Sequence, residues 1–207
     1  MIRVERIKIE ELRVPEVYRY MGIHTGDPDE KLRSMVESCI PDFLNSAGGK
    51  VCFSEERLCI SYDGRNKAAV QMGNILTHSD DLARHLTGCG RCILMAATCG
   101  PQADMLRNRA LIQGGTLRQL VMDALGTEAV EWTADRFTEN LRPVYTGFEL
   151  VSRFSPGYGD LPLELEKDLT AYLDTKRKIG VGLSDSLLLT PSKSITAIIG
   201  IRKINEK

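Results

Sequence analysis

The most constraining feature of the sequence is a short apolar segment from Cys92 to Thr98, which reads CILMAAT. The pair Gly100-Pro101 follows it and interrupts regular structure. An apolar run of this length without alternating polar residues is typical of a β-strand covered on both faces. The segment therefore predicts a strand in the interior of the molecule, with other parts of the chain packed against both of its faces.

Helices and strands are predicted on both sides of this segment. Before it, we expect an edge strand at 4–10, a helix begun by Asp27-Pro28-Asp29-Glu30 and kinked or ended by Pro41, a hairpin of 51–53 and 58–62 across Ser54–Arg57 closed by Asp63-Gly64, and a helix capped by Ser79. After it, we expect two helical stretches split by Gly114-Gly115, the second from about Thr116 to Leu141, a helix from Pro162 to Gly180, and strands at 187–190 and 195–204. Because these elements occur in clusters, the sequence predicts an α+β fold with long helices and a mixed, largely antiparallel sheet.

Composition limits the class of protein. The chain has 207 residues and no linker of low complexity, so we expect one domain over residues 1–207. Its formal net charge of -1 gives no electrostatic reason to expect nucleic acid or an anionic membrane as partner. The N-terminus lacks the apolar core of a secretory signal, and no apolar stretch approaches the length of a membrane span. We therefore expect a cytoplasmic protein with reduced cysteines.

Two cysteines have the spacing of a redox or metal-binding pair. Cys89-Gly-Arg-Cys92 fits a thiol redox pair or part of a zinc or iron-sulfur site, and Cys99 lies seven residues further on. A structural zinc site needs four ligands, and the other cysteines lack the spacing to supply them. We prefer the interpretation that Cys92 and Cys99 pack as small apolar residues in the buried strand. The prediction for metal sites is none.

An acidic helix face and a stiff turn are the candidate binding elements. Residues 124, 128, 131 and 135 share one face of the helix from Thr116 to Leu141, which places three acids together. Such a face is usually solvated. A carboxylate near Arg153, however, would suit a zwitterion, because the arginine fork binds a carboxylate and the acid binds an ammonium.

The turn follows Arg153 directly. In Arg153-Phe-Ser-Pro-Gly-Tyr158, Pro156 restricts one backbone angle and Gly157 permits an unusual one at the next residue. Arg153 and Tyr158 are therefore held in a fixed relation. This arrangement suits a ligand site, and it equally suits a structural loop.

Read together, the motifs of the second half resemble a known family. They are Asp123-Ala-Leu through Glu131, Arg153-Phe-Ser-Pro-Gly-Tyr158, Pro162, Glu166-Lys167, Ile179-Gly180, Leu183-Ser-Asp-Ser186 and Pro191-Ser-Lys-Ser194. This ordered series resembles the reactivation domain of cobalamin-dependent methionine synthase, in its free-standing, single-domain form. Residues 91–207 carry the motifs, whereas residues 1–90 are divergent.

The resemblance implies a function and a site. It implies a stand-alone module that binds S-adenosylmethionine and supports reductive methylation of cob(II)alamin on a partner chain, with electrons from a flavodoxin-like donor. The cobalamin would belong to the partner, a cobalamin-dependent methionine synthase or a related corrinoid protein. The implied S-adenosylmethionine-binding residues are Glu131, Arg153, Ser155, Gly157 and Tyr158. Arg153 would bind the methionyl carboxylate, and no residue of this chain is expected to act as a catalytic acid, base or nucleophile.

Two alternatives remain at this stage. The same fold could dock on a corrinoid protein as a non-catalytic regulator that does not use S-adenosylmethionine. A thiol or iron-sulfur redox protein based on Cys89 and Cys92 is the other alternative.

Overall fold

The computed structural model describes residues 1–24, 27–62 and 67–204. Among these residues, seven strands form one sheet in the order β4-β3-β2-β5-β9-β6, and β1 pairs with β2 outside this path. The strands are β1 (Arg3–Ile7), β2 (Gly49–Tyr62), β3 (Ala68–Met72), β4 (Ile75–His78), β5 (Cys89–Thr98), β6 (Phe148–Leu150) and β9 (Ser194–Lys203). Each of these pairings is antiparallel, and both halves of the chain contribute strands.

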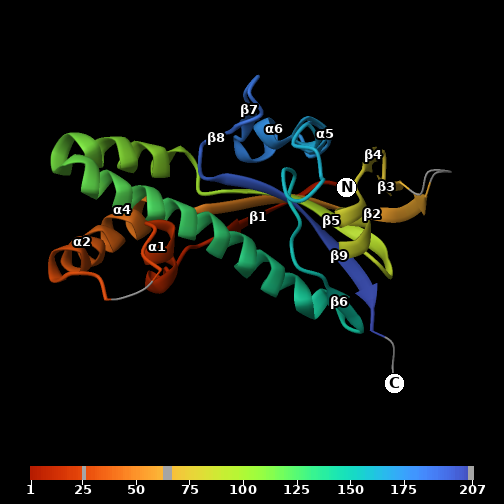
Figure 1. Cartoon of the computed structure of the whole chain (residues 1–207), viewed down its shortest axis with the longest axis horizontal. Coiled ribbons are helices and arrows are strands. Elements are labelled where there is room, and N and C mark those ends of the chain that lie inside the picture. Colours follow the sequence, from red (N-terminus) through yellow and green to blue (C-terminus); the bar gives the residue numbers. More distant parts are fainter. Residues whose placement is uncertain (25–26, 63–66, 205–207) are drawn as a thin grey trace.

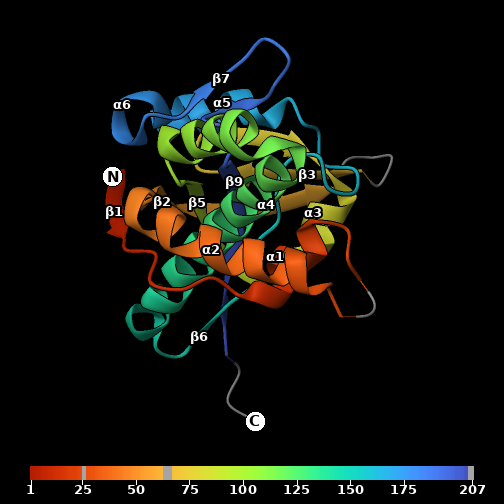
Figure 2. The same cartoon turned by 90° about the vertical axis from the view of Figure 1, so that its left-hand side faces the viewer.

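Helices cover the sheet on both faces (Figures 1 and 2). They are α1 (Val14–Tyr20), α2 (Glu30–Ser46), α3 (Asp80–His85), α4 (Pro101–Leu141), α5 (Leu165–Tyr172) and α6 (Thr175–Ile179), with a 3-10 turn at Arg142–Tyr145. A separate two-stranded ribbon is formed by β7 (Gly182–Leu183) and β8 (Leu189–Thr190). The predicted α+β class, with a largely antiparallel sheet and long helices, is confirmed.

Strand β5 lies between the two hydrophobic cores. Side chains alternate between the faces of a strand, so Ile93 and Met95 join the core beneath α1, α2 and α4. Leu94 and Ala96 join the opposite core, which includes side chains from α3, α5 and α6. All residues from Cys92 to Thr98 are buried. The prediction of a strand covered on both faces is confirmed.

The predicted hairpin at residues 51–62 is wrong. Strand β2 continues through the polar segment, because β5 pairs with it along residues 50–57 and supplies partners for its polar side chains. Glu55 accepts hydrogen bonds from Arg91 of β5 and, at 2.7 Å, from the hydroxyl of Tyr145. The predicted closing turn Asp63-Gly64 lies outside the described residues.

Helix α2 begins later and ends later than predicted. Asp29, not Asp27, is the N-cap, and its carboxylate accepts a hydrogen bond of 2.7 Å from the amide of Leu32. Pro41 does not end the helix, which runs to Ser46. Packing against α4 buries side chains of α2 on both sides of the proline and offsets its missing donor.

The glycine pair splits α4 as predicted. Gly115 has a φ of 74°, which lies outside the helical region and separates two straight segments. Most of the apolar residues predicted to face inward on the second segment are buried, but Leu117 and Leu120 next to the break are partly exposed.

The predicted helix from Pro162 to Gly180 is two shorter helices. The first, α5, begins at Leu165, and Asp174 adopts a left-handed conformation between α5 and α6. Gly180 ends α6 with a φ of 79°, as predicted. No helix in the described part of the chain combines the length and apolar character needed to cross a membrane.

The cysteines behave as packing residues. Cys92 and Cys99 are fully buried, and burial raises the pKa of each thiol to about 12. Cys89 is partly exposed, and burial also raises its pKa. The described residues contain no group of three or more histidine, cysteine, aspartate or glutamate side chains arranged to hold a metal ion.

Thiol reactivity tests this packing. In native protein at pH 8, an alkylating reagent should modify the exposed Cys59 first, whereas Cys92 should react only after unfolding, because its thiolate is unfavourable and inaccessible. Peptide mass spectrometry after timed alkylation gives the order of modification. Cys59→Ser should remove the fast phase. Rapid labelling of Cys92, or stoichiometric iron or zinc in protein purified without oxygen, would restore the redox interpretation.

Candidate functional site: a groove beside helix α4

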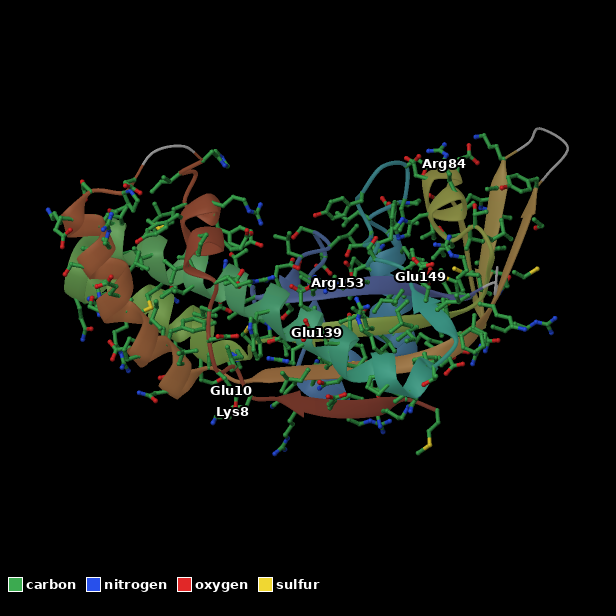
Figure 3. All side chains as sticks on the ribbon, turned by 90° about the horizontal axis from the view of Figure 1, so that it is seen from below. Lys8, Glu10, Arg84, Glu139, Glu149 and Arg153 are labelled. Carbon is green, nitrogen blue, oxygen red and sulfur yellow. The ribbon has the colours of Figure 1, made fainter. Side chains whose placement is uncertain are left out.

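A groove of about 960 Å³ runs along the second half of α4. Its other walls come from the segment of residues 150–156, the start of β9, Arg13 before α1, and Glu166 of α5. In Figure 3, Arg153 lies near the centre of the molecule, between the N-terminal helices and the end that carries Arg84. The groove is therefore built from segments that are far apart in the sequence.

Pairing with β9 determines which way the groove residues point. The amide and carbonyl of Phe154 exchange hydrogen bonds of 2.9 and 2.8 Å with Ile198. Since side chains alternate along an extended segment, Arg153 and Ser155 both point away from Phe154 and line the groove. Ser155 donates a hydrogen bond of 2.7 Å to the carbonyl of Thr196, which holds the segment against β9.

The turn after Arg153 has the shape that its sequence predicts. The amide of Tyr158 donates to the carbonyl of Ser155 at 3.2 Å, with Pro156 and Gly157 at the two central positions. Gly157 has a φ of 86°, which a side chain would disfavour. The Tyr158 side chain is 69% exposed and contributes to the wall of the groove.

Helix α3 holds the same segment from the other side. The carboxylate of Asp160 accepts hydrogen bonds from the hydroxyl of Ser79 and, at 2.8 Å, from the amide of Asp80. The hydrogen bond from Ser79 is the main reason that the pKa of Asp160 is lowered. The ring of His85 lies 2.7 Å from the carbonyl oxygen of Ser152. The segment with Arg153 is thus anchored on both sides.

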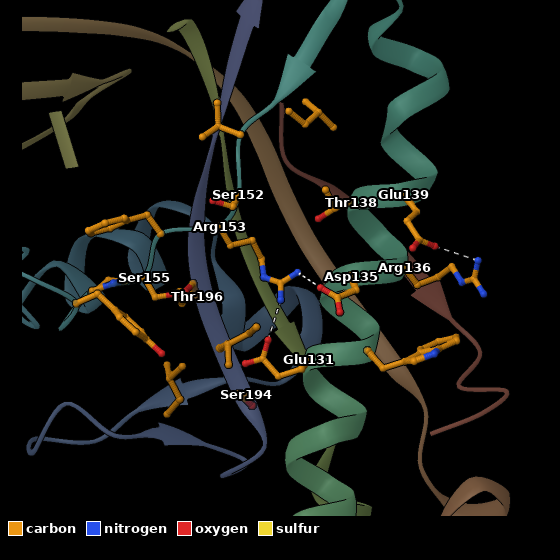
Figure 4. Close-up of a pocket in the computed structure, with 18 of the residues that line it drawn as sticks. Glu131, Asp135, Arg136, Thr138, Glu139, Ser152, Arg153, Ser155, Ser194 and Thr196 are labelled. Carbon is orange, nitrogen blue, oxygen red and sulfur yellow. Dashed lines mark hydrogen bonds and ion pairs between the residues drawn. The ribbon is translucent and has the colours of Figure 1, made fainter. Parts of the chain in front are cut away.

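Five charged residues form a continuous chain in and beside the groove (Figure 4). Arg153 Nη2 donates to Glu131 Oε2 at 2.7 Å, and Arg153 Nη1 donates to Asp135 Oδ1 at 2.7 Å. The other oxygen of Asp135 accepts from Arg13 Nη1 at 2.8 Å. Arg13 in turn binds Glu128 through Nε at 2.6 Å. The chain has one more carboxylate than guanidinium, which favours a positively charged ligand group nearby.

Burial makes one end of this chain rigid. The Glu128 side chain has no exposure to solvent, and it also accepts a hydrogen bond of 3.2 Å from the backbone amide of Arg13. Hydrogen bonding to Glu128 is the largest cause of the raised pKa of Arg13. The usual expectation of a solvated acidic face is therefore wrong at Glu128, because Arg13 allows this carboxylate to be buried.

The structure brings together most of the predicted site residues. Glu131, Arg153, Ser155 and Tyr158 line the groove, whereas Gly157 shapes the turn without lining it. Glu131 and Arg153 contact each other directly. Their role in binding a ligand stays a prediction.

Sequence reasoning missed two contributions to the groove. Arg13 is separated from Glu128 by 115 positions, and no local pattern links them. Glu166 is buried and accepts a hydrogen bond of 2.8 Å from Thr196, while its other carboxyl oxygen has no partner among the described residues. Burial raises the pKa of Glu166. The Glu166-Lys167 pair was noticed only as part of the family motif.

Comparison with known proteins identifies the fold. No protein-family model and no curated protein matches the sequence. A solved structure of the MetH reactivation domain bound to AdoHcy matches 100% of this chain and 80% of its own chain, with a TM-score of 0.73 and 14% sequence identity. This chain has the fold of that reactivation domain. The resemblance predicted from the motifs is confirmed at the level of fold.

Removal of Arg13 tests the importance of the buried pair. Arg13→Ala leaves Glu128 without its cation, so the free energy of unfolding should fall by about 3 kcal/mol, near the lower end for a broken buried pair because Arg13 is half exposed. Urea denaturation measures the change. Arg19→Ala is the matched control, since it breaks only an exposed pair with Glu16 one turn further along α1 and should change stability little. Equal effects of both substitutions would contradict the assignment.

Proposed function

We propose that the protein binds S-adenosylmethionine in the groove beside α4 and serves as a stand-alone reactivation module for a cobalamin-dependent methionine synthase or a related corrinoid protein. The carrying observation is the contact between Arg153 and Glu131 in this groove. The likeness to a reactivation domain that holds AdoHcy supports the choice of ligand. We further propose that residues 1–207 act as one domain in the cytoplasm.

The charges fit an amino-acid head group. Arg153 offers a planar fork for a carboxylate, and Glu131 offers an acceptor for an ammonium, within contact distance of each other. Ser155 is already hydrogen-bonded to β9, so its segment contributes backbone groups in a fixed position. Tyr158, exposed at the wall of the groove, is available to a ligand and to a partner protein.

The residues of this chain need only bind and orient. The reactivity belongs to the sulfonium of S-adenosylmethionine and to the cobalt of a cobalamin supplied by the partner, with the electron from a flavodoxin-like donor. Arg153 and Glu131 hold the head group, and anchoring of the 152–160 segment to α3 and β9 limits its motion. This division of roles agrees with the prediction of no catalytic acid, base or nucleophile.

The alternative is a regulatory module that docks on a corrinoid protein without using S-adenosylmethionine. One observation favours it: both terminal nitrogens of Arg153 already bind carboxylates of this chain. An arginine satisfied in this way has a purely structural interpretation.

Calorimetry separates these functions. S-adenosylmethionine should bind the wild-type protein, and Arg153→Ala should weaken binding about tenfold or more, because a charged hydrogen-bond donor to the carboxylate is lost. Arg153→Lys should weaken it less, since the charge remains but the fork is lost. Arg136→Ala is the control, because Arg136 lines the groove but pairs with Glu139. No heat with S-adenosylmethionine, even with the partner present, would favour the regulator.

Restored cofactor chemistry is the direct test of function. Purified protein, inactive cob(II)alamin-bound synthase, a low-potential reductant and S-adenosylmethionine should together restore the absorbance of methylcobalamin. Omission of the protein or use of Arg153→Ala should abolish the recovery. Equal recovery with wild-type protein and Arg153→Ala would contradict the role of Arg153.

A further inference from the structure

We infer that Asp135 is a positioning residue that competes with the ligand's carboxylate for Arg153 and so sets the affinity of the groove. The inference rests on the proposed function. It adds to that function an internal anion that occupies the ligand's place and an internal cation that receives this anion when the ligand binds. Asp135 is not expected to touch the ligand.

Competition follows from the occupied fork of Arg153. Its two terminal nitrogens bind two different carboxylates, Asp135 through Nη1 and Glu131 through Nη2, each at 2.7 Å. A fork-like contact with a ligand carboxylate uses two N–H groups that point the same way. Arg153 therefore has to release at least one of its present partners before it can bind a ligand in this manner.

Asp135 is the partner that can be released at lower cost. Its second oxygen accepts from Arg13 Nη1 at 2.8 Å, so it keeps a cation after Arg153 turns away. Among the described residues, the ion pair of Glu131 is with Arg153 alone. Glu131, once separated from Arg153, gains a cation again only from the ligand, and an ammonium provides one.

Arg13 can receive Asp135 because its own position is held elsewhere. Its Nε binds the buried carboxylate of Glu128 at 2.6 Å, and Glu128 also accepts from its backbone amide. The contact with Asp135 uses a different nitrogen, Nη1. The receiving group is thus already in place, and the exchange at Asp135 requires no movement of the N-terminal segment.

Asp135→Asn tests the competition, because it removes the charge and keeps the size of the side chain. Binding of S-adenosylhomocysteine should become about fivefold tighter, the effect of removing one partly exposed ion pair that competes with the ligand. Binding of the decarboxylated analogue of S-adenosylhomocysteine should not tighten, because that ligand has no carboxylate to offer Arg153. Calorimetric titration of both ligands gives the difference, which a merely structural role would not produce.

Two further variants make the test specific. Glu139→Gln removes a carboxylate from the same helix and groove, but Glu139 pairs with Arg136 and should leave both affinities unchanged. Asp135→Ser removes the carboxylate by another route and should reproduce the effect of Asp135→Asn. Circular dichroism confirms that each variant is folded before titration.

Each outcome decides between specific claims. Tighter binding of S-adenosylhomocysteine alone, in both Asp135 variants, supports the inference. If wild-type protein binds this ligand but the Asp135 variants bind it equally or less tightly, the inference is wrong and the proposed function stands. Equal tightening of both ligands, or tightening in Glu139→Gln, also overturns the inference. If neither the wild-type protein nor the Asp135 variants bind S-adenosylhomocysteine, the proposed function fails, and the inference fails with it.

Discussion

A carboxylate without exposure to solvent has to be neutralised, and Glu128 meets this requirement through Arg13. This one contact joins the segment before α1 to the middle of α4, across 115 positions of sequence. It also determines where the remaining nitrogens of Arg13 lie, and through them the position of Asp135. The charged wall of the groove therefore depends on an ion pair that lies at one end of it, where burial makes the pair hard to break.

The two-faced sheet explains why a groove exists at this place. Alternating side chains of β5 and β9 require cover on both sides, which α4 provides on one face and α5 and α6 on the other. The segment of residues 150–156 passes beside β9 and in front of α4, with Phe154 directed to one core and its neighbours Arg153 and Ser155 to the groove. The chain thus exposes polar side chains at a boundary where packed layers stop.

Predictability followed the range of the interactions. The buried strand, the cap at Ser79, the break at Gly115 and the helix end at Gly180 depend on neighbours in sequence, and all four were predicted correctly. The continuous strand β2 was missed because its polar residues are satisfied by β5 and by Tyr145. Arg13 was missed for the same reason. The family resemblance was needed to bring Glu131 and Arg153 together as a site, since spacing alone equally allowed a solvated face.

A groove whose charges already satisfy one another binds by exchange, and the gain is a difference between two sets of contacts. Arg153 gives up an internal carboxylate for an external one, and Glu131 gives up an internal guanidinium for an ammonium. Because contacts of similar chemistry are lost and gained, the charged contacts contribute more to the selection of a zwitterion than to total affinity. A ligand with only a carboxylate would leave Glu131 unpaired, and one with only an ammonium would leave Arg153 bound to Asp135. The geometry therefore rewards a head group that carries both charges at once, which is the property of an amino acid.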